Sequence, residues 1–510
     1  MRKTVSYLLL LSMILSVLSF SLLMVSCDVG GTGGGVDLST DNVGNDIAQD
    51  QNNDENEGEQ AEQELIRPNL PERNFEGMEV YFFTMTRERN PNNFAIEVFA
   101  EQMTGEVIND AVFRRNAYLE DRYNFVIREV LTNTTANAGD LSASIRAGDD
   151  MFQVLMLNIR EAAAAAGRGY LLDLAQSTYI DLDMPWWDSQ LNGDMSIGGR
   201  LFYAIGDMNL MANNATWATF FNKTLISDFA LDSPFDLVRE GRWTIDVHHE
   251  MARAVAADLD GNGVMDVYDR WGLVGCDMNT SMFFLGSGER FTRKDANDMP
   301  YLVTDLDGTM RALDIVFNLQ FDRDVVQSVQ DWPGHSPNGW EDPVRVNFRA
   351  DRALFYTAGL LTYTLLRDME SPFGMVPMPM VFPEQQRFYT TLNPNNANTV
   401  AIPITVQNPD SISHVVEAVM AESRHTLRPA YFYVAMERQF MRDEESVEML
   451  EIILESRMFD LIVAYQWGGL IGAVEGLTRT RSRDVASLFE RLQGVTEAAI
   501  AATIEQFETH

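Results

Sequence analysis

The sequence predicts an α/β protein whose folded part contains two domains. From residue 78 onward, segments with strand character alternate with segments of helical period. About 435 residues follow residue 74, which is more than one hydrophobic core comfortably serves. From residue 411 to the C-terminus the sequence is mostly of helical character. These three observations set the fold class.

The first predicted elements alternate between strand and helix. A strand is predicted over Met78–Met85, a helix over Val107–Tyr123 and a strand over Asn124–Val130. A helix over Leu141–Gly148 and a strand over Phe152–Leu157 follow. The helix Val107–Tyr123 is predicted to be amphipathic. Strand-helix-strand order argues for a parallel sheet that helices cover on both faces.

The rest of the body adds one apolar segment and several helices. The segment Thr216–Ile226 is rich in β-branched and aromatic residues. A helix that Thr244 opens is predicted over Trp243–Asp258. The sequence shows no internal repeat and no second membrane span. Further helices are predicted over Arg311–Arg323, Ser411–Glu422 and, with breaks, Glu444–Phe507.

The N-terminus has the form of a secretory signal. Arg2 and Lys3 precede an uncharged apolar run that ends at Cys27. A retained membrane anchor is the alternative. The stretch "LMVSC" resembles the signal of bacterial lipoproteins, with Met24 in place of the usual Leu. Residues 1–26 are therefore predicted to be a lipoprotein signal peptide, with Cys27 lipid-anchored on the extracytoplasmic face of the cell membrane.

The composition is strongly acidic. Residues 28–64 contain neither Lys nor Arg and cannot bury a core, so residues 27–73 are expected to be a lipidated Cys and a disordered acidic tether. The whole chain has 75 acidic and 38 basic residues and a formal net charge of −37, which argues against nucleic acid as a partner. The second cysteine, Cys276, has no partner for a disulfide framework and is expected to be a small buried apolar residue.

The stretch "DLDGNGVMDVYD" matches the twelve-residue calcium loop at its ligand positions. Gly263 stands at the sixth position, where the chain must turn sharply. An ion-free polar turn is the alternative, and the similar "DLDG" at residues 305–308 is interpreted as such a turn. A single loop of this kind indicates a structural Ca²⁺. The predicted ligands are Asp258, Asp260, Asn262, Asp266, the backbone carbonyl of Val264, and Asp269 in place of the usual Glu.

Several stretches of the body resemble one protein family. "IRAGDDMFQVLML", "FFNKTLI" and "WTIDVHHEMARAVAADLDGNGVMDVYDRWGL" resemble segments of the extracellular solute-binding proteins of bacterial ABC importers. The resemblance is to the carbohydrate-type family that includes maltose-binding protein. "MPWWDSQLNGDMSIGGRLFYAIGDMNL" resembles the segment that leads into this family's hinge, and "RPAYFYVAMERQFMRDEESVEML" part of a long C-terminal segment. "FRADRALFY" also resembles a family stretch, although Asp351 stands where Gly is usual.

The resemblance implies a two-lobed, periplasmic-binding-protein-like α/β fold with a hinge between the lobes and a helical C-terminal segment. Lobe one is expected over residues 74–205 with a return at 399–441, and lobe two over 206–394 with 442–510. The resemblance also implies a function. A lipid-anchored, monomeric and non-enzymatic protein would capture a carbohydrate between its lobes and deliver it to a membrane permease.

Tryptophans and short polar side chains are the candidate solute contacts, because rings stack on the C–H faces of a sugar and polar groups meet its hydroxyls. Trp332 and Trp340 lie in a Pro/Gly-rich stretch, and Trp467 precedes two glycines that allow close backbone approach. Packing is the alternative for each ring, and a simple turn is the alternative for the polar pair. The predicted contacts are Trp467, Trp332, Trp340, Trp187, Trp186, Asp207 and Asn209.

Three other functions remain open at this point. A glycosidase would need two carboxylates across a cleft, and no local pattern marks such a pair. Residues 248–250 lack the second His of the H-E-x-x-H pattern, which gives no support to zinc hydrolysis. A peptide or another small solute on the same fold is the second alternative. Calcium-dependent adhesion is the third, and it has only one loop in its favour.

Overall fold

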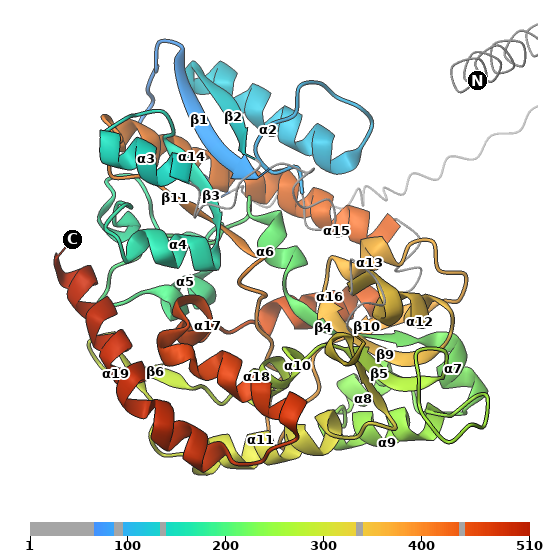
Figure 1. Ribbon diagram of the computed structural model, residues 1–510. Coiled ribbons are helices and arrows are strands. Elements are labelled where there is room, and N and C mark those ends of the chain that lie inside the picture. Colours follow the sequence, from blue (N-terminus) through green and yellow to red (C-terminus); the bar gives the residue numbers. More distant parts are fainter. Residues whose placement is uncertain (1–65, 86–94, 133–138, 333–339, 438–443, 510) are drawn as a thin grey trace, which may run out of the picture. The chain divides into compact units, whose positions relative to one another are not determined.

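Two β-sheets organise the folded part of the chain (Figure 1). The computed structural model describes residues 66–85, 95–132, 139–332, 340–437 and 444–509, all within the compact unit Ile66–His510. The predicted signal peptide, Cys27 and most of the tether lie outside these residues. None of the described helices combines the length and the apolarity needed to cross a membrane.

The first sheet has the strand order β11–β3–β1–β2. β1 (Met78–Met85) runs parallel to β2 (Phe125–Thr132) and to β3 (Val154–Asn158). The helix α2 (Val107–Tyr123) forms part of the crossover between β1 and β2, as a parallel pair requires. β11 (Asn398–Ala401) comes from far along the chain and closes one edge, antiparallel to β3.

The second sheet has the strand order β10–β4–β9–β5–β8. The central strands are buried along their whole length, which explains why their sequences are apolar runs rather than alternating patterns. β5 is parallel to β8 and β9, whereas β4 is antiparallel to β9 and β10. The strands are β4 (Trp217–Asn222), β5 (Trp271–Gly275), β8 (Val326–Ser328), β9 (Ala353–Gly359) and β10 (Phe373–Val376).

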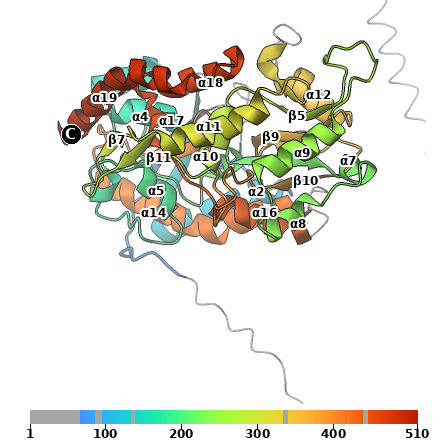
Figure 2. The same ribbon diagram turned by 90° about the horizontal axis from the view of Figure 1, so that it is seen from below.

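Helices pack on both sheets, and α9 lies beside α11 against the second sheet (Figures 1 and 2). Those that come before β11 are α3 (Gly139–Ala147), α4 (Ile159–Ala166), α5 (Ser189–Met195), α6 (Leu210–Asn214), α7 (Lys223–Asp228), α8 (Pro234–Arg239), α9 (Ile245–Val255), α10 (Asn279–Gly286), α11 (Asp307–Gln320), α12 (Val346–Arg349) and α13 (Thr362–Leu365). The later ones are α14 (Pro409–His425), α15 (Leu427–Glu437), α16 (Glu444–Glu455), α17 (Leu461–Tyr465), α18 (Leu470–Thr480) and α19 (Val485–Thr509). A small hairpin joins β6 (Thr292–Lys294) to β7 (Pro300–Leu302).

The structure confirms most predicted elements and corrects two. The segment Thr216–Ile226 is not one element, because β4 ends at Asn222, whose side chain accepts from the N–H of Leu225 and caps α7. The predicted turn at residues 305–308 runs directly into a helix, since α11 begins at Asp307. Thr244 caps α9 as predicted.

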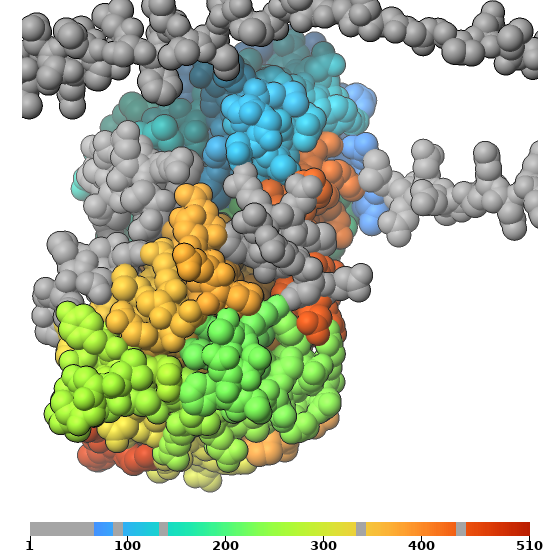
Figure 3. Space-filling view, turned by 90° about the vertical axis from the view of Figure 1, so that its right-hand side faces the viewer, coloured from blue at the N-terminus to red at the C-terminus, as the bar shows by residue number. Residues whose placement is uncertain are grey.

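The carboxyl ends of both sheets adjoin the same two crossing segments, residues 206–216 and 391–397. At the end of β3, the N–H of Ile159 donates to Ala397 O at 3.0 Å. At the end of β9, the N–H of Leu360 donates to Thr216 O at 2.8 Å. This arrangement confirms the two-lobed, periplasmic-binding-protein-like α/β class. In Figure 3 the first lobe (blue) lies at the top and the second lobe (green and yellow) at the bottom.

The predicted lobe limits stay a prediction. The four strands of the first sheet fall within residues 78–158 and 398–401, and those of the second within 217–376. The C-terminal helices touch both lobes, because α16 contacts β10 whereas α17 contacts α4.

Candidate functional site

A pocket of about 520 Å³ lies beside β8 on the second lobe, within the size range of small-molecule sites. Asp331 and Trp332, which follow β8, form one wall. Arg479 and Arg481, at the end of α18, form another. We call this cavity the Trp332 pocket. It brings a predicted solute contact together with side chains that the sequence analysis did not single out.

Trp332 differs from its neighbour Trp271 in how its indole N–H is used. Trp271 is 3% exposed, and its N–H donates to the backbone oxygen of Asp266 at 3.0 Å. The ring of Trp332 is partly buried against the core of the second lobe, and its N–H has no partner among the described residues. A buried donor without an acceptor costs free energy. Because this N–H is itself buried, Trp332 lines the pocket with its ring rather than with a free donor.

Guanidinium groups outnumber carboxylates around the Trp332 pocket. Arg323 forms an ion pair with Asp331, and Arg479 donates to Asp277 at 2.5 Å. The guanidinium of Arg481 is exposed and forms no hydrogen bond or ion pair with any described residue, but its charge and that of Arg323 oppose the raising effect of burial on the pKa of Asp331. The Nε–H of Arg323 is also buried without a partner. The pocket thus offers more hydrogen-bond donors than acceptors.

A polar network leads from this pocket to the first lobe. Asp277, just beyond β5, accepts from the hydroxyl of Ser328 at 2.9 Å. Glu475 on α18 accepts from Ser281, and burial raises its pKa while nearby Arg160 opposes the shift. Arg160 belongs to α4 of the first lobe and donates to the Asn395 side chain at 2.9 Å. The α18 wall of the pocket is therefore electrostatically coupled to the lobe junction.

Two carboxyl groups lie on the first-lobe side of the junction. Glu129 on β2 accepts from the Thr84 hydroxyl at 2.9 Å, and burial raises its pKa. Glu97 accepts from the N–H of Met211 at 2.7 Å and from the side chain of Asn398. Burial raises the pKa of Glu97 to about 8. These groups can accept from or donate to hydroxyls, and the sequence alone did not single them out.

The paired tryptophans Trp186 and Trp187 are core residues. They are 1% and 4% exposed, and both indole N–H groups donate to the carboxyl of Glu417 at 2.9 Å. Burial raises the pKa of Glu417 to about 7, although the two indoles oppose the shift. Neither ring offers a face to a solute, so the structure does not support this part of the predicted site.

Trp467 is also packed in the core, and Trp340 cannot be judged. Trp467 is 3% exposed, stacks on Tyr465 with centroids 5.1 Å apart, and donates to the Thr503 hydroxyl at 2.8 Å. The glycines after it have positive φ (62° and 70°) and serve the turn into α18 rather than a ligand approach. The backbone of Trp340 begins a short π-helix, but its side chain lies outside the described residues.

Asp207 and Asn209 lie in the first crossing segment. Asp207 forms ion pairs with Arg424 at 3.1 Å and Arg428 at 3.3 Å, and burial raises its pKa against the pull of these two groups. Asn209 is 1% exposed and accepts from the N–H of Gly206, while its amide N–H₂ has no partner among the described residues. Asp207 therefore ties the crossing segment to α14 and α15 rather than facing a solute.

The predicted calcium loop connects α9 to β5 and gathers three carboxylates. Oxygens of Asp258, Asp260 and Asp269 lie within 4.8 Å of one another. The N–H of Gly263 donates to Asp258 at 2.6 Å, with φ at 84° in the expected sharp turn. Asp269 is only 2% exposed. Like charges held this close favour a bound cation, and an all-oxygen donor set suits Ca²⁺.

The other predicted ligands have additional roles within the loop. The side-chain oxygen of Asn262 accepts from the N–H of Val264 at 2.7 Å. The carboxylate of Asp266 accepts from the N–H of Tyr268 at 2.7 Å. The backbone oxygen of Asp266 holds the indole of Trp271, which lines the Trp332 pocket. The loop thus braces one wall of that pocket.

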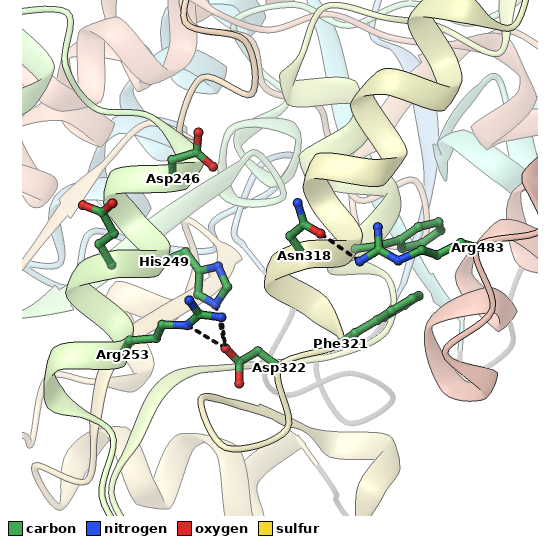
Figure 4. A pocket seen from close by; sticks show the side chains of 9 residues that line it. Asp246, His249, Arg253, Asn318, Phe321, Asp322 and Arg483 are labelled. Atoms are coloured by element: carbon green, nitrogen blue, oxygen red, sulfur yellow. Dashed lines mark hydrogen bonds and ion pairs between the residues drawn. The ribbon is translucent and has the colours of Figure 1, made fainter.

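A second pocket, of about 570 Å³, lies between α9 and α11 (Figure 4). His249 and Arg253 on α9 both bind Asp322, at 2.9 and 2.8 Å. Arg483 binds Asn318 at 2.8 Å and stacks over Phe321. We call it the Arg483 pocket. Its three cationic or imidazole groups all have partners, in contrast to Arg481 in the Trp332 pocket.

The fold is shared with solved solute-binding proteins. The sugar-binding protein MalE of Xanthomonas citri has a TM-score of 0.56 at 15% identity, over 85% of this chain and 100% of that chain. UgpB of Mycobacterium tuberculosis, in complex with glycerophosphocholine, has 0.52 at 15%, over 84% and 99%. The ABC substrate-binding protein Lmo0181 of Listeria monocytogenes, in complex with cycloalternan, has 0.50 at 12%, over 85% and 98%. No known family model matches the chain, and no curated protein matches its sequence.

These likenesses define a class: this chain has the fold of a two-lobed solute-binding protein. At such identities they establish the fold alone. The sequence did contain one unused signal for the site, because "RTRSR" places Arg479, Arg481 and Arg483 at alternate positions in a chain with twice as many acidic as basic residues. The structure divides these three side chains between the two pockets.

Proposed function

We propose that this protein is the solute-binding component of an ABC importer and that it captures a carbohydrate. The observation that carries the proposal is the Trp332 pocket on a two-lobed fold. A partly buried indole with an unused N–H lies there among hydrogen-bonding side chains. Such a combination suits a sugar, whose C–H face stacks on a ring and whose hydroxyls take hydrogen bonds. No catalytic step is needed for this function.

Capture would involve movement of the lobes about the crossing segments. Residues 206–216 and 391–397 link the carboxyl ends of both sheets, so a small rotation there changes the distance between the lobes. Asp207 anchors the first of these segments through two arginines.

Ca²⁺ has a structural role in this proposal. Asp258, Asp260 and Asp269 would hold the ion, with Asn262, Asp266 and the carbonyl of Val264 completing its oxygen shell. The ion would stiffen the loop that supports Trp271.

The chain is further proposed to be a monomeric lipoprotein at the extracytoplasmic face of the cell membrane. Cys27 would carry the lipid, and the acidic segment up to residue 73 would act as a tether. A tether of this kind keeps the body near its permease and raises the effective concentration there.

A thermal-shift screen tests the function directly. The full chain in mild detergent is heated with Ca²⁺ and a panel of mono- and oligosaccharides. A ligand at about a hundred times its Kd adds roughly 2.7 kcal/mol of stability, which raises the Tm by a few degrees at most for a chain of this size. A shift with one saccharide class supports the proposal. A shift only with peptides or with a phosphodiester such as the ligand of UgpB would replace the carbohydrate by that solute.

A further inference from the structure

The charge balance of the Trp332 pocket distinguishes it from the rest of the molecule. The chain carries a formal net charge of −37. The side chains that line this pocket include three guanidinium groups, of Arg323, Arg479 and Arg481, and one carboxylate, of Asp331. Arg323 is paired with Asp331 and Arg479 with Asp277, whereas Arg481 forms no ion pair with a described residue and acts on Asp331 only through its charge. A locally positive site in an acidic protein is unexpected unless it serves a ligand.

The hydrogen-bonding groups of the Trp332 pocket also indicate a ligand that supplies acceptors. The indole N–H of Trp332 and the Nε–H of Arg323 are buried and have no acceptor among the described residues. Arg323 and the N–H of Ser328 both donate to a single oxygen of Asp331, Oδ2. Neither of the two buried donors pairs with the carboxylate of the pocket. A ligand with acceptor oxygens suits the exposed guanidinium of Arg481, and a charged carboxylate supplies them most strongly.

We propose that the Trp332 pocket binds the carboxylate of an acidic saccharide, a uronic acid or an oligosaccharide of uronic acids. This inference rests on the proposed function and specifies its substrate class. Arg481 pairs with the carboxylate, and the indole ring of Trp332 packs on the sugar. The pocket volume of about 520 Å³ holds one or two sugar rings.

Arg481 is the residue expected to distinguish acidic saccharides from neutral ones. It is the last residue of the α18 turn, with φ at 51° and its N–H donating to Thr478 O. Because the backbone at this residue is fixed by the helix end, the base of the side chain has a defined direction. Arg483, two residues later, is bound to Asn318 in the other pocket (Figure 4). It provides a matched control with the same change of charge.

The test is isothermal titration of the full chain in mild detergent with Ca²⁺. The probes are di- to tetrasaccharides of galacturonate, glucuronate and mannuronate, each beside its neutral carboxyl-reduced counterpart. We expect at least one acidic member to bind about tenfold or more tightly than its neutral counterpart, the effect of about one charge-assisted hydrogen bond. The affinity should fall as salt rises, because Arg481 is exposed.

Single substitutions show which side chain produces the preference for acidic ligands. Arg481→Gln should reduce the acidic preference to near unity, whereas Arg483→Gln should leave it unchanged. Trp332→Ala removes the ring and should weaken the acidic and the neutral ligand alike, because stacking on the ring does not depend on the carboxylate. Equal weakening by Arg481→Gln and Arg483→Gln would overturn the assignment, since it would reflect overall charge alone.

The failure of this inference can be told apart from the failure of the proposed function. Neutral saccharides that bind as tightly as acidic ones overturn the acidic class and leave the carbohydrate function standing. Inorganic phosphate that binds as tightly as the uronates also overturns it, because the pocket would then be a general anion site. Absence of binding by every saccharide, acidic or neutral, overturns both.

Discussion

At the scale of single residues, a tryptophan's role follows from its partners rather than from its neighbours in sequence. Trp332 and Trp467 both lie in glycine-containing stretches, and the sequence gives both the same prediction. The structure separates them, because the N–H of Trp467 is satisfied by Thr503 whereas that of Trp332 is unused. Trp467 therefore stabilises the fold, whereas Trp332 lines a pocket with its ring.

Substitution of the two rings should separate stability from binding. Trp467→Ala removes a ring that is 3% exposed, and large-to-small changes of this kind cost about 3–5 kcal/mol. Trp332→Ala should cost less stability but should abolish the thermal shift that the saccharide gives. Chemical denaturation measures the first effect and titration with saccharide the second. Loss of binding by a well-folded Trp467→Ala protein, with Trp332→Ala unaffected, would reverse these roles.

The two tryptophans that are core residues instead of solute contacts, and the glutamate that the sequence did not single out, share one physical explanation. Trp186 and Trp187 are buried because both indoles reach Glu417, about 230 positions away in the chain. Glu97 similarly meets Asn398 of β11. Such pairs depend on which strand closes which edge, and no local pattern in the sequence reports that. The candidate calcium loop, by contrast, could be proposed from the sequence because its predicted ligands lie within twelve consecutive residues.

At the scale of elements, periodicity predicted where helices and strands lie, and capping set where they end. β1 and α2 have the predicted bounds, Met78–Met85 and Val107–Tyr123. β4 is shorter than its apolar stretch because the side chain of Asn222 starts a helix. The long C-terminal helical stretch is broken at Gly468 and Gly469, whose positive φ values interrupt it.

Removal of calcium should lower the stability of the second lobe. EGTA is expected to lower the Tm of the full chain, because the three carboxylates of the loop would then repel one another without a cation. Asp258→Ala combined with Asp260→Ala should make the Tm insensitive to EGTA. Saccharide affinity should fall as well, since the loop supports Trp271 beside the Trp332 pocket.

A matched control exists for this experiment. Asp305 belongs to the similar "DLDG" stretch, and among the described residues its carboxylate accepts only from the N–H of Asp307 at the start of α11. Asp305→Ala should leave the response to EGTA intact. A wild-type Tm that does not change with EGTA would show that the loop is an ion-free turn.

At the scale of the whole molecule, buried ionisable groups of opposite kinds set the pH range of stability. His248 and His414 are 0% exposed, and none of their ring nitrogens has a partner among the described residues. Burial lowers their pKa values to about 3 and about 4. Burial raises the pKa of Glu97 to about 8 and that of Glu417 to about 7.

These two kinds of pKa shift change the stability in opposite directions as the pH rises. The histidines bind protons less readily when folded than when unfolded, so their contribution is present above about pH 6.5 and is lost as the pH falls toward 4. The two glutamates bind protons more readily when folded. Their contribution is present below about pH 4.5 and is lost as the pH rises through 7 and 8. Between pH 4.5 and 6.5 the two contributions change in opposite directions and largely offset one another, so the losses from these groups lie below about pH 4.5 and above about pH 6.5.

The acid side of this profile can be assigned to His414. Its ring lies among Phe75, Tyr123 and Tyr179, at centroid distances of 5.2, 4.9 and 5.3 Å, with no acceptor for a proton. His414→Leu should therefore raise the Tm at pH 4.5 relative to the Tm at pH 6.5, compared with the wild-type chain, because one of the two buried protonation sites is removed. His425→Leu, at a partly exposed position, provides the control and should leave this Tm difference as it is in the wild type. An undiminished acid-side loss in a folded His414→Leu protein would place the sensitivity elsewhere, with His248 beside Phe355 as the next position to substitute.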